Sequence, residues 1–210
     1  MGRSALLVVD PYNDFLAESG KLWPMLAAVA NEVGALDNMR AVLAAAREAR
    51  LAIFVVPHHR STPGDFANWR HATPYQLGAS ELQVFAVGSF GGEWHPDFAP
   101  RADEEVVQEH WGSDGFSGTD LDRRLRQRGV ERVALIGMIA NTCIESTARR
   151  AVELGFHVTL VRDATAAFSA EALRAAHDID APSFAHAVVT AAEWCARVRS
   201  STSRVQETSP

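Results

Sequence analysis

Two segments of the sequence carry residues suited to nucleophilic chemistry. Cys143 lies in the segment 137–145, GMIANTCIE, between the apolar run 133–136 and a helical pattern. Thr142 and Glu145 have capping-box spacing, which predicts Thr142 as the N-cap and Cys143 as the first helical residue. A thiol there lies near unpaired backbone N–H groups and the positive end of the helix dipole, so the spacing favours a thiolate. The alternative is a small buried cysteine that packs beneath the helix.

Asp10 is the second candidate, because it ends the first apolar run, 5–9, and precedes a proline. Asp10 and Cys143 thus each follow a predicted strand. Open parallel sheets bind ligands at the carboxyl ends of their strands, so we expect the carboxylate and the thiol to meet there. On its own, Asp10 equally fits a strand-terminal residue that caps the following turn.

Apolar runs and helical patterns alternate along the chain. Strands are predicted over 5–9, 51–56, 105–107, 133–136, 156–161 and 187–189, and helices over 29–49, 120–128, 142–154, 170–177 and 191–199. This alternation predicts an α/β fold, a three-layer α/β/α arrangement with an open, mainly parallel, Rossmann-like six-stranded sheet. Residues 61–100 lack periodicity and are predicted to form a long functional loop. We expect a single domain over 1–199 and a disordered tail over 200–210.

The composition limits the classes of partner. The 210 residues are 47% hydrophobic with a net charge of −6, which fits a globular domain and a small-molecule substrate rather than nucleic acid or an anionic membrane. Cys143 and Cys195 have unlike surroundings, which predicts free thiols, with Cys195 structural. No signal peptide and no apolar run of the ~20 residues that span a bilayer are found, so we expect a cytoplasmic protein.

Four segments together resemble the isochorismatase-like cysteine hydrolases, a superfamily that includes nicotinamidases and N-carbamoylsarcosine amidases. They are residues 7–15 (LVVDPYNDF), 111–121 (WGSDGFSGTDL), 137–145 and 153–164, in consistent order. The resemblance implies the isochorismatase-like hydrolase fold, with Asp10 as catalytic acid and base and Cys143 as nucleophile. It also implies a non-proline cis peptide between Met138 and Ile139, and an oxyanion hole formed by the backbone N–H groups of Ile139 and Cys143.

The chain departs from this family at one catalytic position. The family's lysine falls on His110, and Lys21 is the only lysine in the chain. We expect His110 to take the place of that lysine, as a donor to Asp10 and to a bound carbonyl or as a second base, because imidazole titrates near neutrality.

The reaction that the resemblance implies is hydrolysis of an amide-type C–N bond of a small metabolite through a thioester on Cys143. Two alternatives stay open. One is a non-catalytic binding protein in which His110 only lines the pocket. The other is vinyl-ether hydrolysis of the isochorismatase type on the same aspartate, against which the cysteine argues.

Aromatic side chains flank the predicted catalytic segments and predict a flat, apolar slot for an aromatic or cyclic amide. The residues assigned to substrate binding are Tyr12, Phe15, Trp94, Trp111 and Phe116. For each of them, core packing or a subunit contact is the alternative. Aromatic content and the resemblance together predict a homo-oligomer, a dimer or a tetramer.

No metal and no other cofactor are predicted. The resemblance points to the zinc motif of nicotinamidases, an Asp-x-His pair after the second strand, but here that place reads Pro57-His58-His59 and lacks the aspartate. His58, His59, His71 and His95 are therefore interpreted as pocket-lining or solvated side chains.

Overall fold

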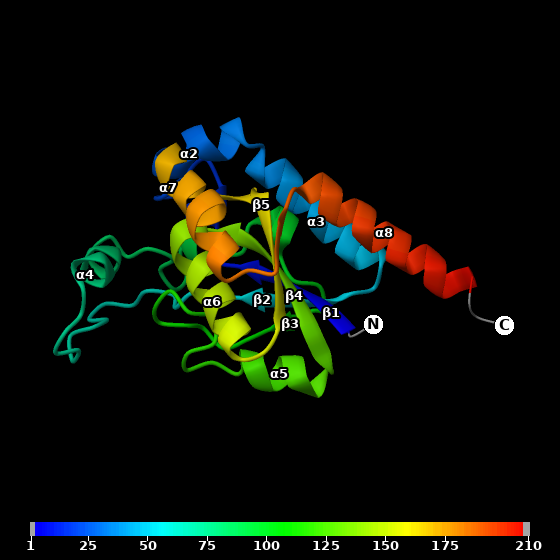
Figure 1. Ribbon diagram of the computed structural model, residues 1–210. Coiled ribbons are helices and arrows are strands. Elements are labelled where there is room, and N and C mark those ends of the chain that lie inside the picture. Colours follow the sequence, from blue (N-terminus) through cyan, green and yellow to red (C-terminus); the bar gives the residue numbers. More distant parts are fainter. Residues whose placement is uncertain (1–2, 208–210) are drawn as a thin grey trace.

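A six-stranded parallel sheet forms the centre of the protein, and the computed structural model describes residues 3–207. The strands lie in the order β3-β2-β1-β4-β5-β6. Their bounds are β1 (Arg3–Val9), β2 (Ala52–Val56), β3 (Glu105–Val106), β4 (Val130–Met138), β5 (His157–Ala166) and β6 (Ala187–Val189). Helices cover both faces (Figure 1), so the predicted three-layer α/β fold is confirmed.

The topological switch point of the sheet lies between β1 and β4. The chain proceeds from β1 to β2 and β3 on one side, and then returns to β4 on the other side of β1. Val9 near the end of β1 pairs with Gly137 near the end of β4. The residues that follow these two strands therefore meet at the carboxyl edge of the sheet, where open parallel sheets bind ligands.

Two hydrophobic cores hold the layers together. One face of the sheet packs against α2 (Trp23–Glu32), α3 (Ala35–Glu48) and α8 (Ala191–Glu207), and the other against α5 (Leu121–Gln127) and α6 (Glu145–Glu153). Within β1, Leu6 and Val8 belong to the first core and Leu7 and Val9 to the second. The strand's period of two sends neighbouring residues to opposite faces, so a strand covered on both sides reads as an uninterrupted apolar run.

Two helix predictions differ from the structure. The predicted helix over 29–49 is two helices, because Gly34 between α2 and α3 adopts a left-handed backbone with φ of 65°. Helix α8 continues to Glu207, so residues 200–207 of the predicted disordered tail are helical, and residues 208–210 of that tail lie outside the described residues. The polar composition of this segment does not stop a helix that already packs against α3. Among residues 3–207, no helix has the length and apolar character to cross a membrane.

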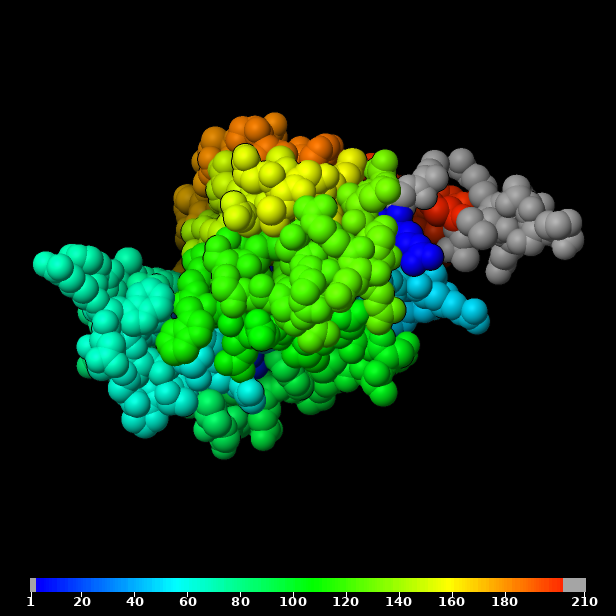
Figure 2. Space-filling view, turned by 90° about the horizontal axis from the view of Figure 1, so that it is seen from below, coloured from blue at the N-terminus to red at the C-terminus, as the bar shows by residue number. Residues whose placement is uncertain are grey.

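Residues 61–92, which we call the arm, project from the body of the protein (Figures 1 and 2). The arm contains α4 (Pro74–Glu81) and ends with the turn η1 (Phe90–Gly92). Helix α4 begins with a capping box between Thr73 and Gln76 and has a proline in its first turn. The prediction that residues 61–100 form a loop is therefore wrong for α4, whose capping box is visible in the sequence.

Short helical segments complete the fold. They are α1 (Asn13–Leu16), η2 (Pro96–Phe98), η3 (Ala140–Ile144), α7 (Ala170–Arg174), η4 (Ala175–Asp180) and η5 (Ala181–Ser183). The predicted helix over 142–154 corresponds to η3 and α6, and that over 170–177 to α7 and the start of η4.

Candidate active site

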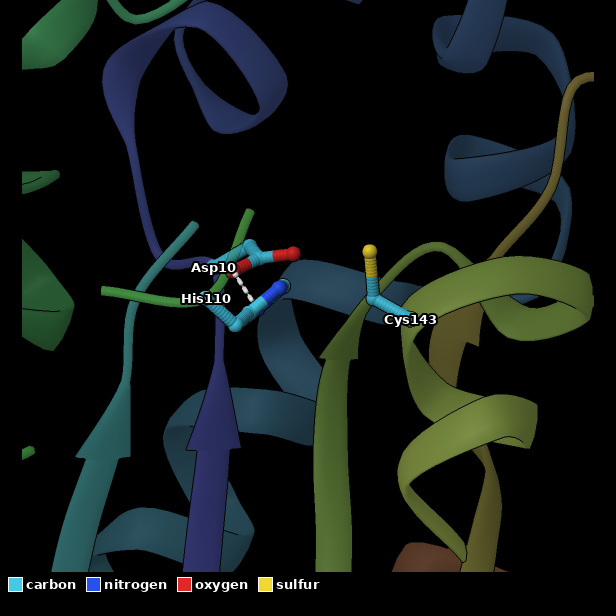
Figure 3. Close-up of side chains that lie close together, drawn as sticks. All are labelled: Asp10, His110 and Cys143. Atoms are coloured by element: carbon cyan, nitrogen blue, oxygen red, sulfur yellow. Dashed lines mark hydrogen bonds and ion pairs between the residues drawn. The ribbon is translucent and has the colours of Figure 1, made fainter. Parts of the chain in front are cut away.

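Asp10, His110 and Cys143 converge at the carboxyl edge of the sheet (Figure 3). Asp10 directly follows β1, Cys143 lies in η3 directly after β4, and His110 follows β3. All three side chains are buried, and one potential ligand atom of each lies within 4.8 Å of the others. The structure thus brings together the three side chains to which the sequence analysis assigned catalysis.

The backbone at the ends of β1 and β4 fixes this approach. Asp10 has a φ of 52°, a left-handed conformation that is uncommon for a residue with a side chain and that aspartate tolerates better than most. Its N–H donates to the carbonyl of Val56 at 3.0 Å. A Cβ atom on Gly137 would lie 2.0 Å from the carbonyl oxygen of Val9, so only glycine allows β4 to lie this close to β1.

Contacts of both ring nitrogens hold the His110 side chain in one orientation. Nδ1 donates to the carbonyl of Gly112 at 2.7 Å, because a carbonyl oxygen can only accept. Nε2 lies 3.1 Å from Oδ1 of Asp10. Burial acts to lower the pKa of His110, but the Asp10 carboxylate outweighs it, so the pKa is raised above its usual value. The Asp10 carboxylate thus favours the protonated form of the ring, which would place a positive charge beside it.

Cys143 lies inside a helical turn that begins earlier than predicted. The N-cap residue of η3 is Ile139, and it has no side-chain capping hydrogen bond. The predicted capping box between Thr142 and Glu145 is wrong, because Thr142 is already inside the turn, with its hydroxyl 3.8 Å from the Cys143 sulfur. The peptide bond between Met138 and Ile139 is cis.

The electrostatics favour a protonated thiol at rest. Burial raises the pKa of Cys143 well above its usual value, and the Asp10 carboxylate raises it further. The sequence analysis predicted a thiolate at the start of a helix, whereas the structure favours the thiol. Burial and the facing Asp10 carboxylate raise the pKa of Cys143 by more than the helix dipole lowers it. Oδ2 of Asp10 is buried without a hydrogen-bond partner among the described residues, and one carboxylate oxygen points at the sulfur in Figure 3. This carboxylate is placed to accept the thiol proton.

A cavity of about 420 Å³ opens onto the Cys143 sulfur. More than half of its lining residues belong to the arm, and the others come from the segments that follow β1, β2, β3, β4 and β5. The lining is predominantly aromatic and aliphatic, and it contains no lysine or arginine. The cavity therefore suits an uncharged, largely apolar molecule better than one that carries a carboxylate.

Two of the five predicted substrate-binding residues, Phe15 and Trp111, line this cavity. Tyr12 and Trp94 do not. Their rings stack on one another at 4.7 Å, and the Tyr12 hydroxyl donates to the carbonyl of His58, so they support the wall from behind. Phe116 is also misassigned, because it packs in the core beneath α5 and α6. The sequence analysis thus correctly predicted that these aromatic residues lie near the site, but it did not show which of them face the cavity.

The cavity lining also contains aromatic side chains that the sequence analysis did not assign to substrate binding, among them Tyr75 and Phe85, and it contains His58, which was interpreted as pocket-lining or solvated. The Phe85 ring stacks against Tyr12 at 4.8 Å. Tyr75 lies in the first turn of α4 and is more than half exposed, so it lies at the rim of the cavity. The capping box of α4 is the sequence signal that could have drawn attention to Tyr75.

His58 is neutral and presents a lone pair. Its Nδ1 donates to the carbonyl of His59 at 2.9 Å, and burial lowers its pKa. Its Nε2 has no recorded partner among the described residues and is not fully enclosed. Since His58 lines the cavity, Nε2 is an acceptor available to a bound molecule.

Of the other three histidines that the sequence analysis discussed, His59 also lines the cavity, whereas His71 and His95 do not. His59 contacts Asp65 at 2.8 Å and Glu109 at 3.4 Å, and its ring stacks on Trp111 at 3.5 Å. His71 is exposed on the arm, and His95 caps η2.

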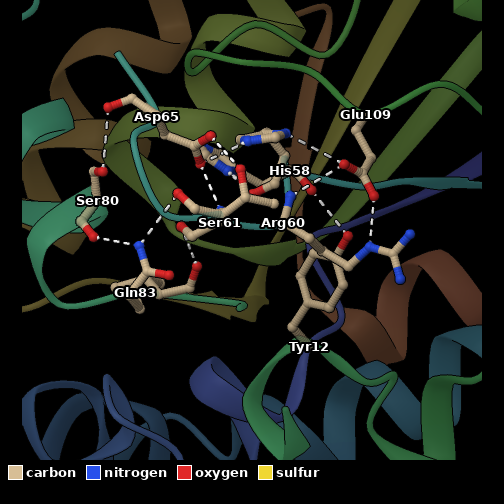
Figure 4. A network of polar contacts seen from close by, with 11 residues as sticks. Tyr12, His58, Arg60, Ser61, Asp65, Ser80, Gln83 and Glu109 are labelled. Atoms are coloured by element: carbon tan, nitrogen blue, oxygen red, sulfur yellow. Dashed lines mark hydrogen bonds and ion pairs between the residues drawn. The ribbon is translucent and has the colours of Figure 1, made fainter. Parts of the chain in front are cut away.

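Polar contacts attach the arm to the body of the protein (Figure 4). Within the arm, the Ser61 hydroxyl donates to the carbonyl of Val84 at 2.6 Å. The N–H of Phe85 donates to Oδ2 of Asp14 in the body at 2.6 Å. The Lys21 ammonium donates to the carbonyls of Leu82 and Gln83 at the end of α4. These contacts position the wall of the cavity opposite Cys143.

Comparison with known proteins assigns the family. The family model described as "Isochorismatase domain" matches residues 4–193. The chain belongs to the isochorismatase family. The family protein YddQ of Bacillus subtilis is 31% identical over 163 residues, which cover 78% of this chain and 77% of YddQ. The ureidoacrylate amidohydrolase RutB of Variovorax paradoxus is 27% identical over 173 residues, which cover 77% of this chain and 68% of RutB.

A solved structure shows the same fold within this family. It is a cysteine hydrolase from Pseudomonas syringae pv. phaseolicola 1448A, with a TM-score of 0.77 and 26% sequence identity, and the match covers 94% of this chain and 93% of that one. Local alignments to other relatives cover as little as 38% of the relative's length. The protein is thus an isochorismatase-family hydrolase, from a family whose members include amidohydrolases of C–N bonds.

Proposed function

We propose that the protein is a cysteine amidohydrolase that cleaves the C–N bond of a small, uncharged, aromatic or cyclic amide. The observation that supports this proposal most is the buried cluster of Asp10, His110 and Cys143, of which Cys143 lines an apolar cavity. A base beside a thiol, oriented by a third group, is the arrangement that activates a nucleophile.

The reaction begins when the substrate carbonyl lies over the Cys143 sulfur. Asp10 takes the thiol proton as the sulfur attacks, and a tetrahedral oxyanion forms. Asp10 then passes the proton to the leaving nitrogen, the C–N bond breaks and a thioester remains on Cys143. Water, deprotonated by Asp10, attacks the thioester and releases the carboxylic acid and the thiol.

We assign the oxyanion to the backbone N–H groups of Ile139 and Cys143, at the start of η3. The first N–H groups of a helical segment lack partners within it and point toward its N-terminal end. The N–H groups of Thr142 and Ile144 already donate to the carbonyl of Ile139. One such donor contributes about 3 kcal/mol to transition-state stabilisation in comparable sites.

His110 keeps a positive charge beside Asp10 throughout this sequence. Protonated His110 donates from Nε2 to Oδ1 of Asp10 and keeps this positive charge next to the reacting groups. A lysine at position 110 would supply the same charge, so we expect the variant H110K to retain measurable turnover and H110A to lose about a hundredfold or more in kcat/KM.

The experiment is a panel of primary amides, neutral and carboxylate-bearing, assayed for release of ammonia. We expect turnover of neutral aromatic or cyclic amides, because the cavity lining offers no cation to a carboxylate. C143A should abolish release. C195A is the matched control, since the Cys195 thiol packs in α8 against the carbonyl of Ala41 and should leave the activity unchanged.

Three results would contradict the proposal. Equal ammonia release by C143A and the parent would remove the thioester route. Tight binding of neutral amides without release of any product would favour the non-catalytic binding protein, and release of pyruvate from a vinyl ether would favour the isochorismatase-type reaction.

A further inference from the structure

We propose that Asp10, His110 and Cys143 also bind a divalent transition-metal ion, of which Zn²⁺ fits best, and that the bound ion blocks the nucleophile reversibly. The inhibitory consequence rests on the proposed function, whereas the binding itself does not. Among the side chains that the structure describes, no other group of three or more His, Cys, Asp or Glu is close enough to hold an ion.

The distances suit such an ion. Zn²⁺ binds oxygen and nitrogen at about 2.0 Å and sulfur at about 2.3 Å, so tetrahedral ligand atoms lie about 3.5 Å apart. Here Nε2 of His110 and Oδ1 of Asp10 are 3.1 Å apart, and the Cys143 sulfur is within 4.8 Å of both side chains. Small side-chain movements therefore suffice, and the set of one sulfur, one nitrogen and one oxygen is of the kind that zinc prefers.

The surroundings already orient the ligand atoms. A metal-binding histidine usually donates its other ring N–H to a carbonyl or carboxylate, and His110 Nδ1 donates to the Gly112 carbonyl at 2.7 Å. The independent sign of a ligand site is Oδ2 of Asp10, a buried carboxylate oxygen without a hydrogen-bond partner among the described residues. A cation between Asp10 and Cys143 would satisfy this atom.

The exchange of lysine for histidine creates this capacity. An ammonium group has no lone pair and repels a metal ion, whereas imidazole becomes a ligand when Nε2 loses its proton. Binding releases two protons, one from His110 Nε2 and one from the Cys143 thiol, and forms three bonds to the metal. The fourth position faces the cavity, where water or Nε2 of His58 can occupy it.

The experiment is a calorimetric titration of the full-length protein with Zn²⁺, in the absence of substrate and with a phosphine reductant. We expect one ion per chain, and binding at least about a hundredfold weaker in H110K and in C143S. Titration with Co²⁺ should give a sulfur-to-cobalt charge-transfer band in the parent protein and none in C143S. Zn²⁺ should also protect Cys143 from iodoacetamide, and a chelator should restore labelling.

The control variant is H157A. His157 and His186 stack at 4.5 Å near the start of β5, at the opposite end of the sheet, and could bind zinc adventitiously. H157A should bind Zn²⁺ as the parent does. The proposal is overturned if the parent binds no Zn²⁺ at micromolar concentrations, if H110K and C143S bind it as tightly as the parent, or if only H157A loses binding.

Discussion

The carboxyl edge of the sheet and the arm contribute to the same cavity but are held in different ways. At the sheet edge, Asp10 and His110 have no exposed surface, and parallel strands packed on both faces fix their positions. The arm exposes large apolar side chains instead. Six of the eleven exposed large hydrophobic side chains among the described residues lie in it: Trp69, Tyr75, Leu77, Leu82, Val87 and Phe90.

This contrast separates the reacting groups from the wall that selects the substrate. The reacting groups lie on the rigid part of the fold, which suits chemistry that depends on distances of a few tenths of an ångström. The wall lies on a projecting segment that a few polar contacts attach to the body. We therefore expect changes at the sheet edge to affect kcat and changes in the arm to affect KM.

The largest effect is expected for Asp10→Asn. The amide cannot take the thiol proton, so kcat/KM should fall by about a thousandfold or more. Because the Asp10 carboxylate raises the pKa of Cys143, its loss should lower that pKa and speed alkylation of the thiol by iodoacetamide near neutral pH. The measurement is the rate of labelling by intact mass beside the rate of turnover. Slower labelling in the variant would contradict our account of the resting thiol.

Next in size is a loss of stability in acid caused by His177. This side chain is 3% exposed in η4, and its Nε2 donates to the Thr165 hydroxyl, which donates in turn to the carbonyl of Arg162. Burial lowers the pKa of His177 to about 4. The unfolded chain therefore binds a proton before the folded chain does as the pH falls.

The contribution of His177 to the free energy of unfolding should be highest above pH ~6.5. It should fall by about 3 kcal/mol as the pH decreases to about 4. Urea unfolding across this range measures the loss, and His177→Gln should reduce its pH dependence. An unchanged slope in the variant would assign the acid sensitivity to other groups.

A smaller effect is expected for Lys21→Met, which removes the ammonium that holds the end of α4. Buried hydrogen bonds that involve a charged group contribute about 1.5 to 3 kcal/mol to stability. Because the hydrogen bonds of Lys21 are exposed, we expect the variant to lose about 1 kcal/mol of the free energy of unfolding. We also expect a severalfold rise in KM with little change in kcat. Lys21→Arg keeps the charge and should behave nearly as the parent. A fall in kcat at constant KM would show that the arm positions reacting groups.

The smallest effect on folding is expected for Leu77→Glu, because the side chain is half exposed on α4. The free energy of unfolding of the single chain should change by less than about 0.5 kcal/mol. If the predicted homo-oligomer forms through the arm, this change should weaken the association, which sedimentation measures. A parent chain that sediments as a monomer would contradict the prediction of an oligomer.

The sequence predicts much of the sheet edge and less of the arm, for physical reasons. Buried parallel strands are continuous apolar runs, so the strands before Asp10 and Cys143 are readable in the sequence, and their shared edge follows from parallel pairing. His110 has no such local pattern. Its position was identified only through the family resemblance, and its pairing with Asp10 depends on contacts 100 residues apart.

The arm follows tertiary contacts that no local pattern encodes. The sequence around Tyr12 and Trp94 does not show that neither ring faces the cavity. Their positions depend on the stacking of the two rings and on the hydrogen bond from Tyr12 to His58. The capping-box error at Thr142 has a similar origin. The helical turn starts at the end of β4, where sheet packing fixes the backbone, rather than at the residue best suited to cap it.

The central claim is that the Cys143 sulfur carries the acyl group during turnover. Mass spectrometry of protein quenched in acid during steady-state hydrolysis of a neutral aromatic amide tests it directly. We predict a fraction of chains heavier by the acyl group, with the adduct on the peptide that contains Cys143 and absent from C143A. Ammonia release with no adduct on that peptide, and undiminished in C143A, would contradict the claim.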